Sequence, residues 1–354
     1  MNHTSKSDIY PLKRFFKTAG GAIDAFIFGS PEVTADAPHI RDYMNLKKYM
    51  ILVIMAVTPS ALASIYFFGW RALVVIIFSF LFGVTTEWIF ATFRKEELTE
   101  GAFVTCLIYP MILPPTVPLW IVAVGIVFGT IFGKESFGGT GKNLFNPALV
   151  GRIFIAIAFP LAMSAQWHEP ISGVYGGLNT YSVDGVTTAT ALTNFKSSGT
   201  IASYWQLFIG NIPGCLGETS KLLIILGGLF LMITKISNWR IPVAYLGTVA
   251  LLSSILSQIY PDRFAPPLFQ LLSGGLLFGA MFMVTDPVTS PMTLQGKWLS
   301  GFLLGILTIV IRGLSGYSEG VMFAIILMNI FNPLIDNAVL AMIIAKNKIV
   351  TRNS

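Results

Sequence analysis

Charged side chains are scarce in this sequence of 354 residues. Asp, Glu, Lys and Arg together make up 11% of the chain, whereas hydrophobic residues make up 54%. A soluble domain typically carries about 25% charged residues, so this chain has too few to cover a surface that faces water. The composition excludes a soluble enzyme and predicts an integral membrane protein, with no nucleic acid as a partner.

Cysteine and histidine are also rare, which limits the cofactors that the chain can ligate. The two cysteines, Cys106 and Cys215, form no Cys-x-x-Cys pair, and an iron–sulfur cluster held by this chain alone would need four thiolates. Cys106 lies in an apolar run, where a packed thiol is expected. The histidines His3, His39 and His168 lie in polar segments. We therefore expect neither a haem nor a metal site.

Long apolar runs dominate the rest of the sequence. A helix needs about 20 apolar residues to cross the hydrocarbon core of a bilayer, and ten segments approach that length. No secretory signal precedes them, and the polar stretch 1–47 is expected to be a tail. The ten candidate spans are 48–68, 70–92, 101–113, 117–133, 147–164, 220–235, 239–259, 268–284, 299–312 and 319–341.

Two of these segments are short and are interrupted by proline. The segment 101–113 ends at Pro114 and Pro115, and the segment 268–284 ends just before Pro287. Each is the third apolar segment of its half of the chain. Short, broken segments at matching places are typical of the half-helices in inverted-repeat transporters.

A five-residue motif also occurs once in each half, as Asn143-Leu-Phe-Asn-Pro147 and as Asn329-Ile-Phe-Asn-Pro333. Five crossings in each half would place the two halves in opposite orientations. The predicted fold class is an all-α polytopic membrane protein with about ten transmembrane helices, arranged as two inverted five-helix repeats with broken half-helices. The expected domains are a tail at 1–47, a first membrane repeat at 48–164, an external loop at 165–219, a second repeat at 220–341 and a tail at 342–354.

The distribution of basic residues predicts the orientation in the membrane, because cytoplasmic loops carry an excess of Lys and Arg. Eighteen of the 23 basic residues fall on one side of the ten-span arrangement, which makes both termini cytoplasmic and the long loop external. The eighteen are Lys6, Lys13, Arg14, Lys17, Arg41, Lys47, Lys48, Arg94, Lys95, Lys134, Lys142, Arg152, Lys235, Arg240, Lys297, Lys346, Lys348 and Arg352.

Several acidic residues fall inside or beside the candidate spans. A charge at the bilayer centre costs about 2.5–3.5 kcal/mol on insertion scales, so such residues are usually paired or functional. Glu87 and Asp336 lie deepest, and each is interpreted either as an interhelical or interfacial partner or as part of an ion path. Asp286 follows the broken segment, where exposed backbone groups can serve a small cation or a cofactor.

The long loop contains the stretch Asp184-Gly-Val-Thr-Thr-Ala-Thr-Ala-Leu192, which is rich in small residues and threonine. One interpretation is a turn-rich connector with no chemical role. The other is a modification site, because a threonine hydroxyl in an extended segment of small residues is open to an outside enzyme, and a nearby carboxylate can orient it.

The pattern Asp-x-x-(Ser/Thr)-x-Ala-Thr resembles the flavinylation motif of a family of membrane proteins. Its two branches are NqrB, from the Na⁺-translocating NADH:quinone reductase (Nqr), and RnfD, from the Rnf complex. In that family the last threonine carries FMN through a phosphoester bond. The resemblance therefore assigns the flavin to Thr190 and places Asp184 and Thr187 at the supporting positions. Thr188 stands where many members have Gly or Ser.

Other segments between residues 40 and 340 resemble the same family. They are Gly101-Ala-Phe-Val-Thr105, Ile112-Leu-Pro-Pro115, Lys134-Glu-Ser-Phe-Gly-Gly-Thr-Gly-Lys-Asn143, Asn146-Pro-Ala-Leu-Val-Gly-Arg152, Asn211-Ile-Pro-Gly214 and Thr285-Asp-Pro-Val288. The segment 136–143 is not a phosphate-binding loop of the P-loop type, because Ser136 and Asn143 stand where that motif needs Gly and Ser or Thr. A backbone nest there that contacts a flavin or a quinone stays open.

The resemblance implies an FMN-carrying subunit of a multisubunit, ion-translocating oxidoreductase in the bacterial inner membrane. Such a subunit passes single electrons and helps couple them to Na⁺ or H⁺ movement. Its implied partners are the other subunits, membrane lipid, a quinone and the flavin transferase that matures it, and its second cofactor is a non-covalent riboflavin. No catalytic residue is assigned.

Two branches of the family and two other classes remain as alternatives. Segments such as Gly296-Lys-Trp298 and the long N-terminal tail favour NqrB, to which the resemblance leans. The chain length, Tyr66-Phe-Phe-Gly-Trp70 and Gly316-Tyr-Ser-Glu-Gly320 favour RnfD. The rivals from other classes are a non-redox inverted-repeat transporter and a structural membrane anchor.

Overall fold

The computed structural model describes residues 46–164, 167–171, 173, 175–181, 188–317 and 319–353, without the side chains of 164 and 347–353. Within these residues the chain is helical and forms no strand; an isolated bridge joins Trp167 and Thr188. The first half contains α2 (Leu46–Phe68), α3 (Trp70–Arg94), α4 (Gly101–Met111), α5 (Leu119–Gly133), η1 (Glu135–Phe137), α6 (Pro147–Ala158) and α7 (Pro160–Ser164).

The middle of the chain forms short elements, and the second half returns to long helices. The loop contains η2 (Gly176–Asn179), α8 (Ala191–Ser198), α9 (Tyr204–Ile209) and η3 (Leu216–Glu218). The second half contains α10 (Lys221–Ile233), α11 (Arg240–Ile259), α12 (Pro267–Leu272), α13 (Leu276–Phe278), the π-helical turn η4 (Gly279–Met283), α14 (Leu294–Leu314) and α15 (Val321–Asn353).

Six helices of the described chain are long and apolar enough to cross a membrane, which confirms the prediction of a helical, multi-pass membrane protein. The apolar helices α4, α6 and α10 are shorter. The expected span at 268–284 is divided among α12, α13 and η4, and the expected span at 147–164 is divided at Pro160. It remains a prediction that α4, α6 with α7, α10, and α12 with α13 and η4 each cross the membrane fully. The inverted relation of the two halves also remains a prediction.

The short segments end where the backbone can no longer continue a helix. Pro114 and Pro115 follow α4, and proline supplies no N–H for a helical hydrogen bond. Gly274 follows α12 with a φ of +63°, a left-handed conformation that favours glycine. Both interruptions lie inside the bundle, so their backbone groups need partners other than water.

Arginine side chains supply partners at both interruptions. Arg71 donates to the carbonyl oxygens of Pro115, Thr116 and Val117 at 3.0–3.2 Å. Arg312 donates to the carbonyl oxygens of Gln270 and Ser273 at 2.7 and 3.0 Å. Each half of the chain thus closes its break with an arginine from a neighbouring helix, and neither arginine is among the eighteen basic residues assigned to the cytoplasmic side.

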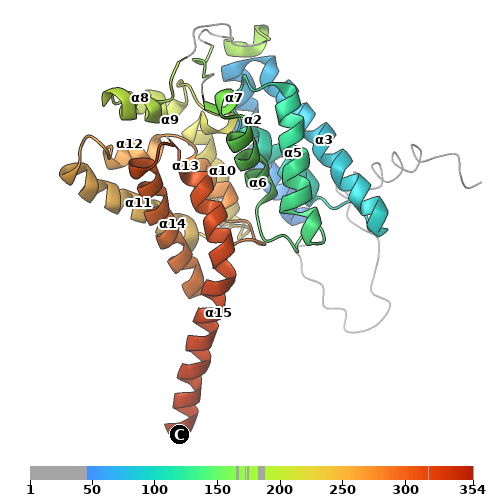
Figure 1. Ribbon diagram of the computed structural model, residues 1–354, viewed down its shortest axis with the longest axis vertical. Helices are drawn as coiled ribbons and strands as arrows, with labels where there is room; N and C mark the ends of the chain where they lie inside the picture. The colour runs from blue at the N-terminus through green and yellow to red at the C-terminus, as the bar shows by residue number, and fades with distance from the viewer. Residues whose placement is uncertain are drawn as a thin grey trace, which may run out of the picture.

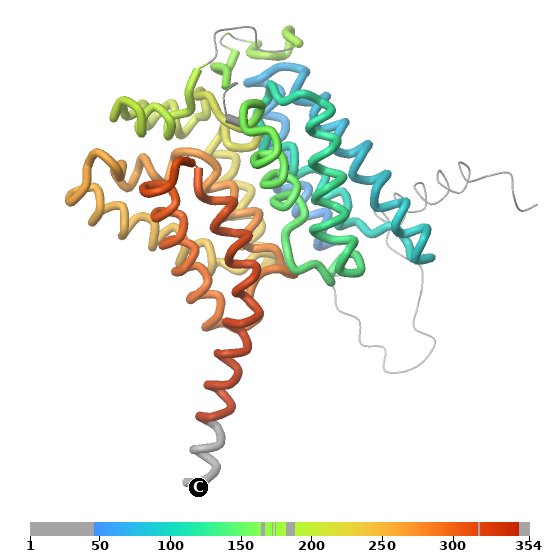
Figure 2. Tube along the Cα trace, viewed as in Figure 1, coloured from blue at the N-terminus to red at the C-terminus, as the bar shows by residue number. Residues whose placement is uncertain are grey.

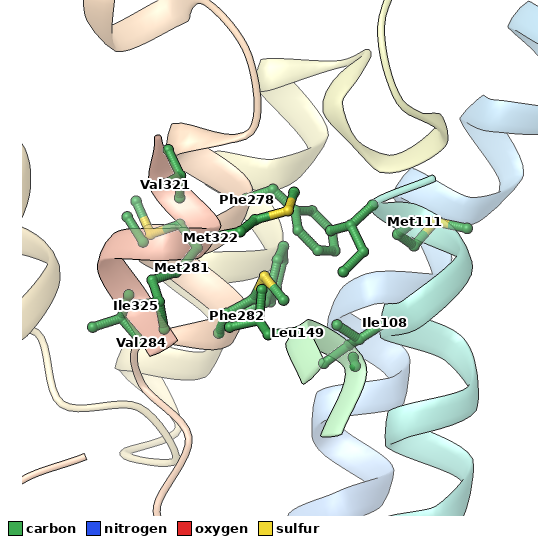
Figure 3. Close-up of a cluster of buried hydrophobic side chains, with 14 of the residues drawn as sticks. Ile108, Met111, Leu149, Phe278, Met281, Phe282, Val284, Val321, Met322 and Ile325 are labelled. Atoms are coloured by element: carbon green, nitrogen blue, oxygen red, sulfur yellow. The ribbon is translucent and has the colours of Figure 1, made fainter. Parts of the chain in front are cut away.

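The interrupted segments meet in the apolar core (Figure 3). Ile108 and Met111 of α4 lie across from Phe278 and Phe282, with Leu149 of α6 beside them. All five side chains are buried. The core therefore joins the two halves of the chain at the level of their broken helices.

Two helix pairs approach closely through glycines, as small residues permit in membrane bundles. A Cβ on Gly129 of α5 would lie 2.4 Å from the carbonyl oxygen of Pro147 and 2.8 Å from the amide nitrogen of Gly151 in α6. A Cβ on Gly301 of α14 would lie 2.7 Å from Cβ of Ala244 in α11. Neither glycine can carry a side chain unless its helix moves away from its partner.

The elements of the long loop gather at one end of the bundle, and the C-terminal part of α15 leaves the other end (Figures 1 and 2). α15 has 33 residues, which correspond to about 50 Å of helix. That length exceeds the roughly 30 Å thickness of a bilayer core. The helix continues through residues 342–353 of the expected tail, and the loop and the end of α15 lie at opposite ends of the bundle.

Replacing Gly129 by Ala is expected to destabilise the bundle by about 1–3 kcal/mol, because the added methyl group meets backbone atoms of α6 that cannot rotate away. The measurement is the thermal unfolding of the detergent-purified protein, followed by size-exclusion chromatography. The matched control is Gly247→Ala in α11, where a Cβ meets nothing within 4 Å. Equal unfolding temperatures for the two variants would contradict the close packing of α5 on α6.

Candidate functional site

Thr190 is the N-terminal cap of α8. Its Oγ1 accepts a hydrogen bond from the amide of Thr193 at 3.3 Å and lies 2.9 Å from Oγ1 of Thr193. The backbone of Thr190 is extended and its side chain is half-buried. The residue predicted to carry the flavin therefore presents its oxygen at the positive end of a helix.

The segment before Thr190 is held by a backbone contact. The amide of Thr188 donates to the carbonyl oxygen of Trp167 at 2.7 Å, and Oγ1 of Thr188 donates to the same oxygen at 3.3 Å. The predicted supporting residues Asp184 and Thr187 lie outside the described residues, so their roles stay predictions.

α8 packs on the second half of the chain through a small apolar cluster. Leu192 and Phe195 are buried against Leu207 of α9 and Phe269 of α12. The rings of Phe195 and Phe269 have centroids 5.7 Å apart. Because these contacts anchor the first turn of α8, the position of Thr190 is fixed relative to the broken helix.

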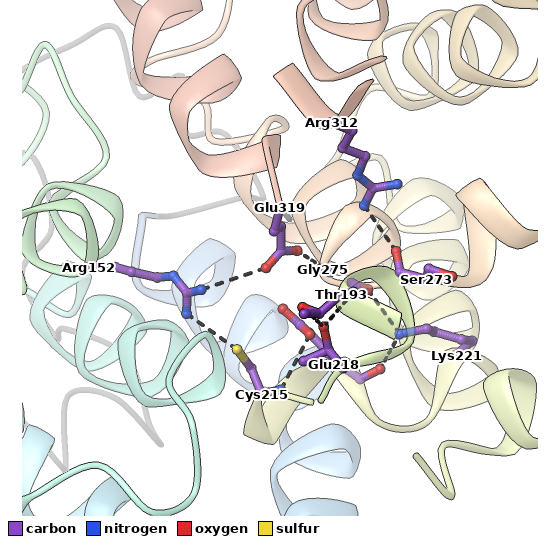
Figure 4. A network of polar contacts seen from close by, with 11 residues as sticks. Arg152, Thr193, Cys215, Glu218, Lys221, Ser273, Gly275, Arg312 and Glu319 are labelled. Carbon is purple, nitrogen blue, oxygen red and sulfur yellow. Dashed lines mark hydrogen bonds and ion pairs between the residues drawn. The ribbon is translucent and has the colours of Figure 1, made fainter. Parts of the chain in front are cut away.

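A buried polar network lies beside α8 and joins both halves of the chain (Figure 4). Arg152 of α6 lies 3.6 Å from the carboxylate of Glu319 and donates to Sγ of Cys215 at 3.3 Å. The amide of Gly275, at the start of α13, donates to the other oxygen of Glu319. Arg152 is buried and contacts Cys215 of the long loop, so the prediction that grouped it with the basic residues on the side opposite that loop was wrong.

The remaining members of the network provide hydrogen-bond partners for backbone groups at the break in the helix. The ammonium group of Lys221 donates hydrogen bonds to the carbonyl oxygens of Glu218 and Gly274. The side chain of Glu218 accepts from the amide of Cys215 at 3.3 Å. With Arg152 and Arg312 the network contains three basic groups and, with Glu319, two carboxylates, so its formal charge is positive even when both carboxylates are ionised.

Cys215, Glu218 and Glu319 bring one sulfur and two carboxylates within 4.8 Å of one another. Arg152 donates to the sulfur and pairs with Glu319 at the same time. A guanidinium group in this position repels a metal cation and occupies the lone pairs that would bind it. The donor set therefore does not fit a metal ion.

Two cavities border this network. A hollow of about 610 Å³ lies within the range of about 300–1,000 Å³ that is usual for small-molecule sites. A second cavity, of about 30 Å³, touches Thr190, Lys221 and Gly274. Trp167 and Glu319 line both cavities. The larger hollow is also lined by Arg152, Pro160, Thr193, Lys196, Tyr317 and Phe323.

Burial changes the proton affinity of the loop residues. It raises the pKa of Glu218 to about 7, and the negative charge of Glu319 contributes to the same shift. Burial likewise raises the pKa of the Cys215 thiol, which keeps that thiol protonated. The pKa of Lys196 is lowered by burial first and by Arg312 second.

A second polar region surrounds Glu87, one of the acids predicted for an ion path. Its carboxylate lies 2.6 Å from the ammonium of Lys134, and both side chains are buried. Arg94 and Glu135 form another pair at 2.6 Å. The deep position predicted for Glu87 is therefore that of an interhelical ion pair.

Asp286 lies next to this region, whereas Asp336 does not. Asp286 accepts from the amide of Val288 at 3.1 Å and from the hydroxyl of Thr289 at 3.3 Å. It lines an apolar pocket together with Lys134, the partner of Glu87. Asp336 accepts instead from the amides of Met292 and Thr293, at 2.7 and 3.0 Å, before the start of α14. An ion path through these acids stays a prediction.

The two Asn-containing motifs contact each other. The amide group of Asn329 accepts from the backbone N–H of Asn146 and donates to the carbonyl oxygen of Ile325, both at 3.2 Å. Asn146 caps α6 through the amide of Ala148. Asn332 donates to the carbonyl oxygen of Thr289 at 2.8 Å. The motif thus has a structural role in joining the halves.

These observations define the class of the protein. It is a multi-pass membrane protein in which buried charges close interrupted helices beside a threonine that caps a loop helix. A family model described as the NQR2, RnfD, RnfE family matches residues 33–344, and the chain belongs to this family.

Similar proteins come from both branches of that family. The subunit designated B in the Na⁺-translocating NADH-quinone reductase of Ectopseudomonas mendocina is 39% identical over 90% of each chain. Its counterpart of the same name in Chromohalobacter salexigens is 37% identical over 89% of this chain and 87% of its own. The subunit designated D in the proton-translocating ferredoxin:NAD⁺ oxidoreductase complex of Clostridium ljungdahlii is 38% identical over 85% of this chain and 92% of its own. These relatives are subunits of ion-translocating oxidoreductases.

Replacing Lys134 by Met is expected to destabilise the protein by about 3–5 kcal/mol, because the carboxylate of Glu87 would remain buried without its partner. The double variant Glu87→Gln/Lys134→Met should recover much of that loss. Thermal unfolding in detergent measures both effects. Additive effects of the two substitutions would contradict a direct ion pair.

Proposed function

We propose that this chain is the FMN-carrying membrane subunit of a multisubunit Na⁺-translocating NADH:quinone oxidoreductase, with FMN bound covalently to Thr190. In this role it passes electrons and helps couple them to ion transport. The observation that carries the proposal is the position of Thr190, which caps α8 beside a hollow large enough for a small cofactor. Membership of the family supports it.

The residues around Thr190 fit a phosphoester of FMN. A phosphate on Oγ1 would sit at the N-terminus of α8, where free amide groups and the helix dipole favour an anion. Arg152 and Lys196 line the adjacent hollow and supply positive charge. Trp167, Tyr317 and Phe323 supply apolar and aromatic surface for a flavin ring.

The role of this chain's residues is to hold and surround the cofactor. The flavin supplies one-electron chemistry, whereas the protein supplies position and electrostatic environment. Thr190 fixes one end of the cofactor to a helix that is anchored by Leu192 and Phe195. The positive charge of the buried network favours negative charge on the bound group.

Ion coupling is proposed for the second polar region, around Glu87 and Asp286, and for Asp336 near the start of α14. Asp286, Glu87 and Asp336 are the candidate ion-path residues, and Asp286 and Lys134 share one pocket. We place this machinery in ten transmembrane helices, arranged as two inverted repeats in the bacterial inner membrane, with both termini in the cytoplasm. The position of the loop opposite the C-terminus supports that orientation (Figure 1).

A non-covalent riboflavin and a quinone are also proposed as ligands, without assigned residues. The pocket that Asp286 lines has a volume of about 80 Å³, below the range of about 300–1,000 Å³ that is usual for small-molecule sites. Its size suits an ion or water molecules rather than either ligand. Other subunits, membrane lipid and a flavin transferase complete the proposed set of partners.

The alternative within the family is the RnfD component of an Rnf-type ferredoxin:NAD⁺ complex. Relatives from both branches have similar identity to this chain. The genes beside the coding sequence separate the two. A neighbouring soluble flavoprotein with NADH-binding and 2Fe-2S domains indicates Nqr, whereas a ferredoxin-like subunit with several clusters indicates Rnf.

Co-expression of this chain with a flavin transferase should give a protein band with flavin fluorescence after denaturing electrophoresis. Thr190→Val should abolish the fluorescence, because no hydroxyl remains to form the phosphoester. The matched control is Thr193→Val, which removes a hydroxyl one turn away and should keep the band. A fluorescent Thr190→Val protein, or no fluorescence in the unmodified chain, would favour a transporter or anchor without a redox role.

Asp286→Asn should reduce ²²Na⁺ uptake into vesicles that contain the assembled complex, because the neutral amide binds a cation less strongly than the carboxylate does. NADH oxidation measured in the same vesicles separates ion transport from electron transfer. The control is Asp262→Asn, at a position outside the pockets described above. Unchanged uptake per NADH oxidised would remove Asp286 from the ion path.

A further inference from the structure

Glu218 and Glu319 bring two carboxylates together inside the protein (Figure 4). A Cβ on Gly275 would lie 2.8 Å from Oε1 of each glutamate. A Cβ on the neighbouring Gly274 would lie 2.9 Å from Oε1 of Glu319 and 2.9 Å from Cδ1 of Leu192 in α8. The two glycines therefore leave the room that the carboxylates occupy, directly beside the helix that Thr190 caps.

The two carboxylates have very different partners. Glu319 is paired with Arg152 and accepts from the amide of Gly275. Glu218 is only 5% exposed, and one of its oxygens accepts a single long hydrogen bond, from the amide of Cys215 at 3.3 Å. Its Oε1 has no hydrogen-bond partner among the described residues. An ionised carboxylate in this position is costly, and a bound proton removes the cost.

The charged groups around Glu218 do not neutralise it through contact. Lys221 directs its ammonium to two backbone carbonyls, and Arg312 directs its guanidinium to Gln270 and to the carbonyl oxygen of Ser273. No Lys or Arg of the described chain forms an ion pair with the carboxylate of Glu218. The titratable groups on the surrounding elements are Arg152 of α6, Lys196 of α8, Cys215, Lys221 of α10, Tyr245 of α11, Arg312 of α14 and Glu319.

The cavity of about 30 Å³ connects this carboxylate to Thr190. Thr190, Glu218, Glu319 and Trp167 all line it, and its volume is sufficient for a water molecule. A charge on a group attached to Thr190 would act on Glu218 through the buried, weakly screening surroundings of this cavity.

We propose that Glu218 is a proton-binding site whose occupancy follows the charge of the group on Thr190. The proposal rests on the attachment of FMN to Thr190. When that group gains an electron from the complex's electron donors, a water-borne proton from the loop side of the protein forms an O–H bond with the Glu218 carboxylate. When the electron leaves, the proton returns, and no other bond changes. Glu319, which is paired with Arg152, is the positioning residue that tunes this site.

The shifted proton affinity of Glu218 agrees with this role. Burial and the charge of Glu319 raise its pKa to about 7, so near neutral pH the carboxyl is about half-protonated and responds to any added charge nearby. Electron arrival should therefore raise the pKa further and cause uptake of a fraction of a proton. The response should disappear well below the lower of these two pKa values and well above the higher one.

The first test uses the full chain without flavin and infrared difference spectra recorded between about pH 5 and about pH 9. The band of a protonated carboxyl should vanish with a midpoint near pH 7. Glu218→Gln should remove that transition and keep the hydrogen bond to Cys215. Glu169→Gln, at an exposed position of the same loop, should leave it unchanged. A transition that persists in Glu218→Gln would overturn the proposal.

The second test measures the midpoint potential of the Thr190-bound flavin against pH in the assembled complex. A slope that approaches but does not reach about 59 mV per pH unit, the value for one proton per electron, is expected near pH 7. Glu218→Gln should flatten the slope there, and Glu169→Gln should not. Glu319→Gln should move the sensitive region to lower pH, because it removes the charge that raises the proton affinity of Glu218.

The outcomes separate this proposal from the proposed function. Absence of a covalent flavin in the fluorescence assay would overturn the proposed function and the coupling, while the flavin-free infrared transition would still report on Glu218. A covalent flavin with the same slope in Glu218→Gln would overturn the coupling alone. If Glu218→Gln does not assemble, an unshifted infrared transition in Glu319→Gln overturns the proposal.

Discussion

The need to satisfy interrupted backbone inside an apolar bundle governs this structure. Water is absent from the bilayer core, so each unpaired carbonyl or amide there costs several kcal/mol. The chain meets that cost with long basic side chains. Arg71 closes the break after α4, and Arg312 and Lys221 close the break between α12 and α13. The buried charges follow from the broken helices, and the positive network beside Thr190 follows from the buried charges.

The sequence predicted the helical membrane fold because long apolar runs have one stable arrangement in lipid. It also predicted the interruption at Pro114, since proline acts locally, but it placed the second interruption near Asp286, whereas the structure breaks the helix at Gly274 between α12 and α13. It did not predict the network of Arg152, Glu218 and Glu319, whose members are 66 and 101 positions apart along the chain. Arg152 was grouped with the cytoplasmic charges because charge alone does not show which residues meet inside the fold. The signal available was the presence of several charged residues at the ends of apolar runs.

The two polar regions of the bundle differ in their electrostatic character. The pair of Glu87 and Lys134 is neutral, buried and held by one short contact of 2.6 Å. The network around Arg152 has more basic than acidic groups and includes a carboxylate, Glu218, that no cation of the described chain contacts directly. A neutral pair is suited to holding helices together, whereas an unbalanced network responds to a charge placed beside it.

The cap formed by Thr190 also has a consequence for the biogenesis of the protein. Its hydroxyl is engaged with Thr193, and the first turn of α8 depends on that contact. An enzyme that esterifies the hydroxyl has to displace Thr193 first, so it acts most readily on a chain in which α8 has frayed or has not yet docked. If the proposed ester forms at this hydroxyl, modification of Thr190 and capping of α8 therefore compete for the same oxygen atom.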